Sequence, residues 1–521
     1  MTRQPNFLFL ITDQQRKDYL GVNGHKVLKT PHLDTLAARG TNFQRFQVAS
    51  PICMPNRASL LTGRLPSTHG LRHNGNPLPG NTVTFVDVLR EGGYRTAAIG
   101  KSHLQPFTPV PAYERVNPDT IGPIKEARWP DGNPYDLERP ETYEGDKRFE
   151  FTEPFYGFEH VDMVLNHGHL AGGHYLQWLR KTGVDIDFIR DRNNELPHDY
   201  TCPQAYRTPI PEELYHTSYI RDRAIDYLNA QQSSEAPFFA FVSFPDPHHP
   251  FNPPGKYWEL YDPDSFEVPL PFEAHQNPIP PMQKALELYK QGATPATPQT
   301  VFIAEQRQVQ EAMALTCGMI SMIDDAVGEL IQTLKNNGQY DNTVIVFTSD
   351  HGDYLGDFNL MLKGALPFKS ITNVPFIWSD PETQQARQSN ALASTLDIAP
   401  SIIARAGLKP FWGIQGMDLS GCLQGSDELR DACLIEYHDG LARLGFEEPA
   451  IVRSLMTDDF RLTLYKGQPW GELYDLLNDP DETYNRWDDP DFANVKAKLI
   501  TRLAHEMMDS MDRSPRATYM A

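Results

Sequence analysis

The chain has 521 residues, with 40% apolar and 22% charged side chains, which is typical of a folded globular protein. Its net charge of −21 argues against a nucleic acid or an anionic membrane as partner, because both are bound through basic surface. The length exceeds what one hydrophobic core usually supports, so we expect a large domain over residues 1–410 and a smaller one over residues 411–521.

Five widely spaced cysteines stand at Cys53, Cys202, Cys317, Cys422 and Cys433. They form no CxxC pair, so the sequence predicts neither a zinc site nor a disulfide framework. The first apolar run, residues 7–11, is too short for a signal-peptide core or a membrane span. We therefore expect a cytoplasmic protein with reduced thiols.

Continuous apolar runs predict the strands of a mostly parallel sheet, because strands buried on both faces lose the alternation of polar and apolar residues. The clearest runs are residues 7–11, 43–49, 94–100, 237–244, 342–348 and 374–378. Apolar periodicity with flanking glycine or proline predicts helices between them, at residues 30–40, 58–62, 82–91, 214–230, 302–336 and 394–406. Pro400 should kink or break the last helix. This alternation is typical of an α/β domain.

Two segments interrupt the pattern, because residues 105–210 and 252–298 are rich in proline and show little periodicity. A structureless loop of that length is unusual in a compact domain, so we expect insertions with short elements. The first would act as a lid or an oligomer contact, and the second would pass over the site. Beyond residue 410 we expect a small antiparallel sheet, with strands at residues 432–437, 450–456 and 459–465 and a final helix at 491–510.

Polar side chains follow five of the predicted strands, close to their carboxyl ends. These are Asp13-Gln14, Cys53 with Arg57, Lys101 with His103, His248, and Asp350-His351. Open α/β sheets bind ligands at that edge, so we expect the five groups to meet in one crevice.

The run from Cys53 to Arg57, followed by Ala-Ser-Leu-Leu-Thr-Gly, resembles the Cys-x-Pro-x-Arg signature of the type I sulfatases. Three further runs resemble the same family: TPHLDTLAARG at residues 30–40, GYRTAAIGKSH at 93–103 and GELYDLLNDPDE at 471–482. The resemblance covers nearly the whole chain apart from the two insertions. It implies an alkaline phosphatase-like fold, with a mostly parallel sheet flanked by helices and a small C-terminal α+β subdomain.

In that family a maturation enzyme oxidises the signature cysteine to formylglycine, whose hydrated aldehyde attacks a sulfate monoester and forms a covalent hemiacetal sulfate. The resemblance implies one divalent metal ion, bound by Asp13, Gln14, residue 53, Asp350 and His351. Oxygen ligands suit Ca²⁺ or Mg²⁺, whereas the imidazole of His351 favours Mn²⁺ or another transition ion.

The resemblance also implies how the substrate is held. Arg57 would stabilise the deprotonated aldehyde hydrate, since arginine is always charged and suits oxyanions. Lys101 and Lys363 would bind the sulfate oxygens, and Asn74 is a weaker candidate for an oxygen contact.

Two histidines carry the proton transfers that the resemblance implies. His248 would protonate the leaving alkoxide, although the adjacent His249 could take that role. His103 would remove the remaining proton of the hydrate, so that the aldehyde reforms and sulfate leaves.

The sequence departs from the most familiar pattern at two ligands. Gln14 and His351 stand where many sulfatases have Asp and Asn. Phosphonate monoester hydrolases of this fold share the Gln, the Ser-Asp-His-Gly run and the formylglycine, but they have Tyr and Thr at the positions of Lys101 and His103. We therefore predict a sulfatase of the arylsulfatase type, with promiscuity toward phosphonate monoesters and phosphodiesters.

Two alternatives belong to other classes. A non-catalytic relative would keep Cys53 as a thiol, and the complete set of candidate ligands argues against it. A phosphatase with a Ser or Thr nucleophile is disfavoured because position 53 holds cysteine. The expected partners are a small anionic ester and a formylglycine-generating enzyme. We also expect a homo-oligomer, and favour a two-fold dimer because it is the commonest assembly.

Overall fold

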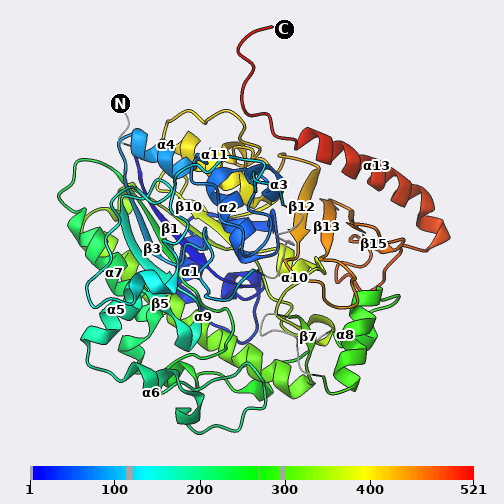
Figure 1. The fold of residues 1–521 in the computed structure, drawn as a ribbon, viewed down its shortest axis with the longest axis horizontal. Helices are drawn as coiled ribbons and strands as arrows, with labels where there is room; N and C mark the ends of the chain where they lie inside the picture. The colour runs from blue at the N-terminus through cyan, green and yellow to red at the C-terminus, as the bar shows by residue number, and fades with distance from the viewer. Residues whose placement is uncertain (1–3, 113–120, 269, 294–299, 521) are drawn as a thin grey trace.

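The computed structural model describes residues 4–112, 121–268, 270–293 and 300–520 (Figure 1). The large sheet has nine strands. Their order is β11 (Arg387–Ser394), β2 (Thr41–Gln47), β10 (Phe376–Ser379), β8 (Thr343–Ser349), β1 (Asn6–Thr12), β6 (Phe238–Ser243), β3 (Arg95–Gly100), β4 (His160–Leu165) and β5 (Gly172–Gly173). Only β10 and β5 run antiparallel to their neighbours in this sheet, which confirms the expected α/β architecture.

The strand β1 shows why its sequence is apolar throughout. Phe7, Phe9 and Ile11 face one hydrophobic cluster, whereas Leu8 and Leu10 face another. Side chains of successive residues point to opposite faces of a strand, so a strand covered on both faces must be apolar at every position.

Helices supply the cover on each face of the sheet. The cluster around Phe9 includes residues of α2 (Cys53–Thr62), α4 (Phe85–Glu91) and α11 (Ile398–Arg405). The cluster around Leu10 includes residues of α1 (Pro31–Ala37), α7 (His216–Ala230) and α9 (Gln306–Asn336). Further helices are α3 (Pro66–His69), α5 (His174–Lys181), α6 (Ile186–Arg190), α8 (Pro280–Lys290), α10 (Lys369–Thr372) and α12 (Ser420–Leu423). In the described part of the chain, no helix has the length and apolar character needed to cross a membrane.

A second sheet lies in the C-terminal region, at the right of Figure 1. Its antiparallel strands are β12 (Ala432–His438), β13 (Ile451–Thr457), β14 (Phe460–Tyr465) and β15 (Gly471–Asp475). Helix α13 (Ala493–Asp509) packs on it through Leu503, which joins a cluster with Leu455 and Leu462. The expected small subdomain is therefore present, while its boundary at residue 410 stays a prediction.

The structure corrects several predicted elements. The helix expected from residue 302 begins at Gln306, because β7 (Phe302–Ile303) pairs with β9 (Leu360–Met361) instead. Strand β11 was not predicted, since its first half carries polar residues at the edge of the sheet. Pro400 does not break α11, because it lies in the first turn, where its missing N–H has no helical partner to lose.

The first insertion also contributes strands to the main sheet. Strands β4 and β5 lie within residues 105–210, and they extend the main sheet beside β3. The insertion therefore adds a further strand end to the edge where the other polar groups gather.

The junction between β3 and Lys101 supports a stability prediction. Gly100 has φ of +108°, and a Cβ atom there would lie 1.9 Å from the carbonyl oxygen of Ser243. Gly93 also has a positive φ, +90°, but nothing lies within 4 Å of its Cβ position. We expect Gly100→Ala to lower the free energy of unfolding by roughly 3 kcal/mol and Gly93→Ala by roughly 1 to 2 kcal/mol. Urea denaturation followed by circular dichroism measures both, and equal losses would contradict the steric argument.

Candidate active site

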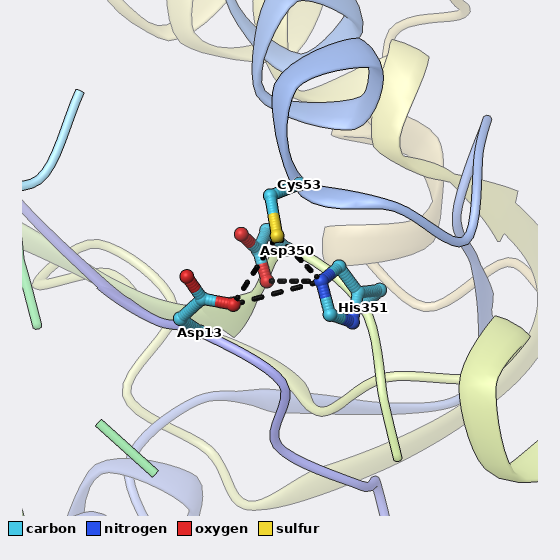
Figure 2. A group of neighbouring side chains, drawn as sticks. All are labelled: Asp13, Cys53, Asp350 and His351. Carbon is cyan, nitrogen blue, oxygen red and sulfur yellow. Dashed lines mark hydrogen bonds and ion pairs between the residues drawn. The ribbon is translucent and has the colours of Figure 1, made fainter. Parts of the chain in front are cut away.

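The predicted groups meet at the carboxyl ends of the central strands. Asp13 follows β1, Asp350 and His351 follow β8, and Cys53 begins α2. Figure 2 shows these four side chains pointing toward one another. The sulfur of Cys53 lies 3.1 Å from Nε2 of His351 and 3.7 Å from Oδ1 of Asp13. All four are at most 1% exposed, so the strand-end prediction correctly identified one buried cluster.

Arg57 ties this cluster to the neighbouring strands. Its Nε donates to Oδ2 of Asp350 at 2.6 Å, and its Nη1 donates to the carbonyl of Lys101 and to Oγ of Ser243, both at 2.8 Å. Its Nη2 lies 3.9 Å from Oδ2 of Asp13. Burial opposes the charge of Arg57, but Asp350 and Asp13 outweigh it and raise the pKa of the guanidinium.

Asp13 is paired with a cation in this buried setting. Its Oδ2 accepts a hydrogen bond from Nζ of Lys101. Burial raises the pKa of Asp13, yet Lys101 and His248 more than compensate and hold that pKa well below its usual value.

Gln14 is oriented by its neighbours on both sides. Its Oε1 accepts from Nζ of Lys363 at 2.7 Å, and its Nε2 donates to Oδ2 of Asp353 at 2.5 Å. Nε2 also lies 3.2 Å from Nδ1 of His249. The amide oxygen therefore faces the cationic side of the site. Asp353 was not predicted as part of the site. Its contact depends on the left-handed backbone of Gln14, with φ of +69°, which the sequence does not reveal.

Lys363 stands directly beside the candidate nucleophile. Its Nζ lies 3.1 Å from the sulfur of Cys53 and 3.2 Å from Nε2 of His351. Burial and Asp13 raise the pKa of the thiol. Lys363, Lys101 and His351 outweigh them, so the net pKa of Cys53 is lowered.

The donor set fits a divalent cation. Carboxylate oxygens of Asp13 and Asp350, Nε2 of His351 and the sulfur of Cys53 all lie within 4.8 Å of one another. Buried carboxylates of this kind are compensated by metal ions or by paired cations. Oxygen and imidazole donors suit Ca²⁺, Mg²⁺ and Mn²⁺ alike.

The adjacent histidines differ in their contacts. Nδ1 of His248 donates to the carbonyl oxygen of His249 at 2.5 Å, which leaves Nε2 of His248 free for a proton. His249 instead contacts Gln14, as described above. Burial lowers the pKa of both imidazoles well below the ordinary value.

His103 lies against the first insertion. Its ring stacks on Phe107 with centroids 3.8 Å apart, and its backbone N–H donates to Glu138 at 2.7 Å. Glu138 is fully buried and also accepts the N–H of Gln105 at 2.5 Å. Burial raises the pKa of Glu138 to about 7. No sequence motif marks this carboxylate.

Asn74 contacts the backbone next to Cys53. Its Oδ1 accepts the backbone N–H of Met54 at 3.1 Å, which satisfies a free donor in the first turn of α2. Its predicted contact with substrate stays a prediction.

His167 belongs to the site but was not predicted from the sequence. His167 follows β4 and places Nε2 2.7 Å from Nζ of Lys101 and 3.4 Å from Oδ2 of Asp13. Its ring stacks on that of His248 at 3.6 Å. The same strand-end rule would have found it, had β4 been recognised within the insertion.

Comparisons with known proteins agree with this geometry. The Sulfatase family model matches residues 5–408, and the model for the C-terminal region of N-sulphoglucosamine sulphohydrolase matches residues 359–509. An uncharacterized sulfatase of Escherichia coli, YidJ, is 29% identical over 98% of this chain and 88% of its own. An arylsulfatase of Clostridium perfringens is 26% identical over 92% of this chain and 90% of its own. The crystal structure of a phosphonate monoester hydrolase of Agrobacterium radiobacter superposes with a TM-score of 0.77, at 25% identity, over 99% of this chain and 98% of its own.

The cluster of donor side chains gives a prediction about Asp350. We expect Asp350→Asn to weaken binding of a divalent cation by about 10- to 100-fold or more, because it removes a charged ligand. Titration calorimetry on chelator-treated protein measures the affinity. Asp380→Asn is the matched control, since Asp380 is also buried and accepts from an arginine, Arg405, at 2.7 Å. Equal metal affinity in the two variants would remove Asp350 from the ligand set.

Proposed function

The chain belongs to the sulfatase family, and from this membership we propose that it hydrolyses sulfate monoesters through a formylglycine made from Cys53. The observation that carries the proposal is the position of Cys53. Its sulfur lies 3.1 Å from Nζ of Lys363 and 3.1 Å from Nε2 of His351, at the head of α2. A nucleophile in that place would meet an anionic substrate next to positive charge.

The proposal includes one divalent metal ion. Asp13, Gln14, Asp350, His351 and residue 53 would hold it, as Ca²⁺ or Mn²⁺. When bound, the ion neutralises the oxygens of an anionic ester and polarises its central atom. The donor cluster around Asp13 supports this assignment.

The modified residue 53 would supply a hydrated aldehyde as nucleophile. Arg57 would stabilise the deprotonated hydroxyl, since its guanidinium lies between the carboxylates of Asp350 and Asp13. The sulfuryl group would pass first to residue 53 and then leave as sulfate, and a maturation enzyme is the partner that this route requires.

Two lysines and two histidines complete the proposed reaction. Lys101 and Lys363 would bind the sulfate oxygens, because both ammonium groups are buried beside the cluster. His248 would protonate the leaving oxygen through Nε2, since its Nδ1 is engaged by a backbone carbonyl. His103 would take the proton that releases the aldehyde.

Phosphonate monoester hydrolysis is the second candidate activity. The likeness to the Agrobacterium enzyme favours it, and so do Gln14 and His351. Lys101 and His103 favour sulfate, because the phosphonate enzymes have Tyr and Thr at these two positions. We propose sulfate as the better substrate and phosphonate monoesters and phosphodiesters as slower ones.

The ratio of the two activities tests the proposal. We expect kcat/KM to be higher for an aryl sulfate than for an aryl phosphonate monoester in one preparation. Cys53→Ala should reduce both by about 10⁴-fold or more, because the nucleophile is lost. A preference for the phosphonate would show that Lys101 and His103 do not set specificity. An unchanged rate in the variant would contradict the role of Cys53.

The general acid gives a separate prediction. His248→Ala should reduce kcat by roughly 100- to 10,000-fold for esters of poorly acidic alcohols, and much less for esters of acidic phenols. His249→Ala is the comparison variant. It removes the contact with Gln14 and the stack on His248 at 4.0 Å, so it should reduce kcat for esters of poorly acidic alcohols less than His248→Ala does. A leaving-group series measured for both variants decides the assignment, and the reverse pattern would give the role to His249.

A further inference from the structure

The first insertion contributes a histidine to the interior of the site. His167 lies two residues beyond the end of β4. Its backbone N–H donates to Oδ1 of Asn166 at 3.0 Å, in a turn where Asn166 has φ of +60°. The side chain of His167 is 6% exposed. A polar side chain buried to this extent needs hydrogen-bond partners, so its contacts indicate its role.

The first partner is the ammonium group of Lys101. Nε2 of His167 lies 2.7 Å from Nζ, and a lysine can only donate, so Nε2 is the acceptor. Lys101 also contacts Asp13 and lies 5.4 Å from the ring of Phe107. His167 therefore fixes the direction in which the ammonium presents its remaining proton.

The second partner is the ring of His248. The two imidazoles stack with centroids 3.6 Å apart and planes inclined by 8°. His248 is held at its other side by the hydrogen bond from Nδ1 to the carbonyl of His249. The ring of His249 lies against His248 with centroids 4.0 Å apart and planes inclined by 25°. The closer and more parallel stack on His167 restrains rotation of the His248 ring, so His167 helps to set the direction of its Nε2.

We propose that His167 is a positioning residue of the hydrolytic reaction, joining the lysine that binds the sulfate oxygens to the histidine that protonates the leaving oxygen. This inference rests on the proposed function. It gives the first insertion a part in the chemistry, because the residue that aligns both groups comes from the strand that the insertion adds to the sheet.

A second metal ion is the competing explanation. Asp13, His167 and His248 offer ligand atoms within 4.8 Å of one another. However, the ammonium of Lys101 already contacts both Asp13 and His167. Lys101 brings the positive charge that these groups need, so we assign His167 to Lys101 rather than to a cation.

Two substitutions separate the contacts of His167. His167→Phe keeps a ring against His248 and removes the nitrogen that meets Lys101. His167→Gln keeps a polar acceptor and removes the stacking. His169→Phe is the control, because His169 lies two residues further on and packs against Tyr206 at 4.4 Å instead.

Three measurements follow on metal-loaded protein: binding of inorganic sulfate by calorimetry in a Cys53→Ala background, kcat/KM for a series of aryl sulfates, and metal content. We expect His167→Phe to weaken sulfate binding by about 10- to 100-fold, the range for a lost hydrogen bond to a charged group, without altering the dependence on leaving group. His167→Gln should steepen that dependence and leave sulfate binding within about threefold of the original. The control should change neither.

The outcomes separate this inference from the proposed function. If the unaltered protein hydrolyses no sulfate ester, the proposed function fails, and sulfate binding alone decides the role of His167 toward Lys101. If it is active and both variants lose the same factor on every substrate, His167 is only structural and the inference is overturned. Loss of one of two metal equivalents in the variants would also overturn it, in favour of a second ion.

Discussion

The site depends on the neutralisation of two carboxylates that have no access to water. Asp13 and Asp350 are 0% exposed, and an uncompensated buried charge costs several kcal/mol. Arg57 pairs with Asp350, and Lys101 pairs with Asp13. Because Arg57 comes from α2 and Asp350 follows β8, the first pair holds α2 against the central sheet, and the second pair joins the ends of β3 and β1.

The same constraint explains the amide at position 14. With Asp353 included, three buried carboxylates face three permanently or ordinarily positive side chains, Arg57, Lys101 and Lys363. A carboxylate at position 14 could not donate to Asp353 as the amide does, and the two like charges would repel each other. Gln14 supplies an oxygen without that charge, and Asp353 orients the amide so that the oxygen faces Lys363.

The parts of the fold and of the site that could be predicted from the sequence are those next to strands with a clear apolar pattern. The central strands were visible because burial on both faces demands apolar side chains, and the residues after them could then be assigned to one crevice. Strand β4 lies in a segment without clear periodicity, so His167 was missed along with it. The conformation of Gln14 and the hydrogen bonds of Glu138 depend on residues distant in the chain, and local sequence carries no information about them. The identity of a bound metal and the alcohol part of a substrate would depend on the same kind of contact between distant residues.

The order of the strands also has a consequence for biosynthesis. Cys53 ends up 1% exposed, and its partner Lys363 lies 310 residues later in the chain. At the usual rate of translation the ribosome needs roughly 15 to 60 s to make that stretch. Throughout this interval Lys363 is absent, so the set of contacts that buries Cys53 is incomplete. An enzyme that oxidised Cys53, as proposed above, would reach the thiol on the nascent chain, before β8 joins β1 and the pocket closes.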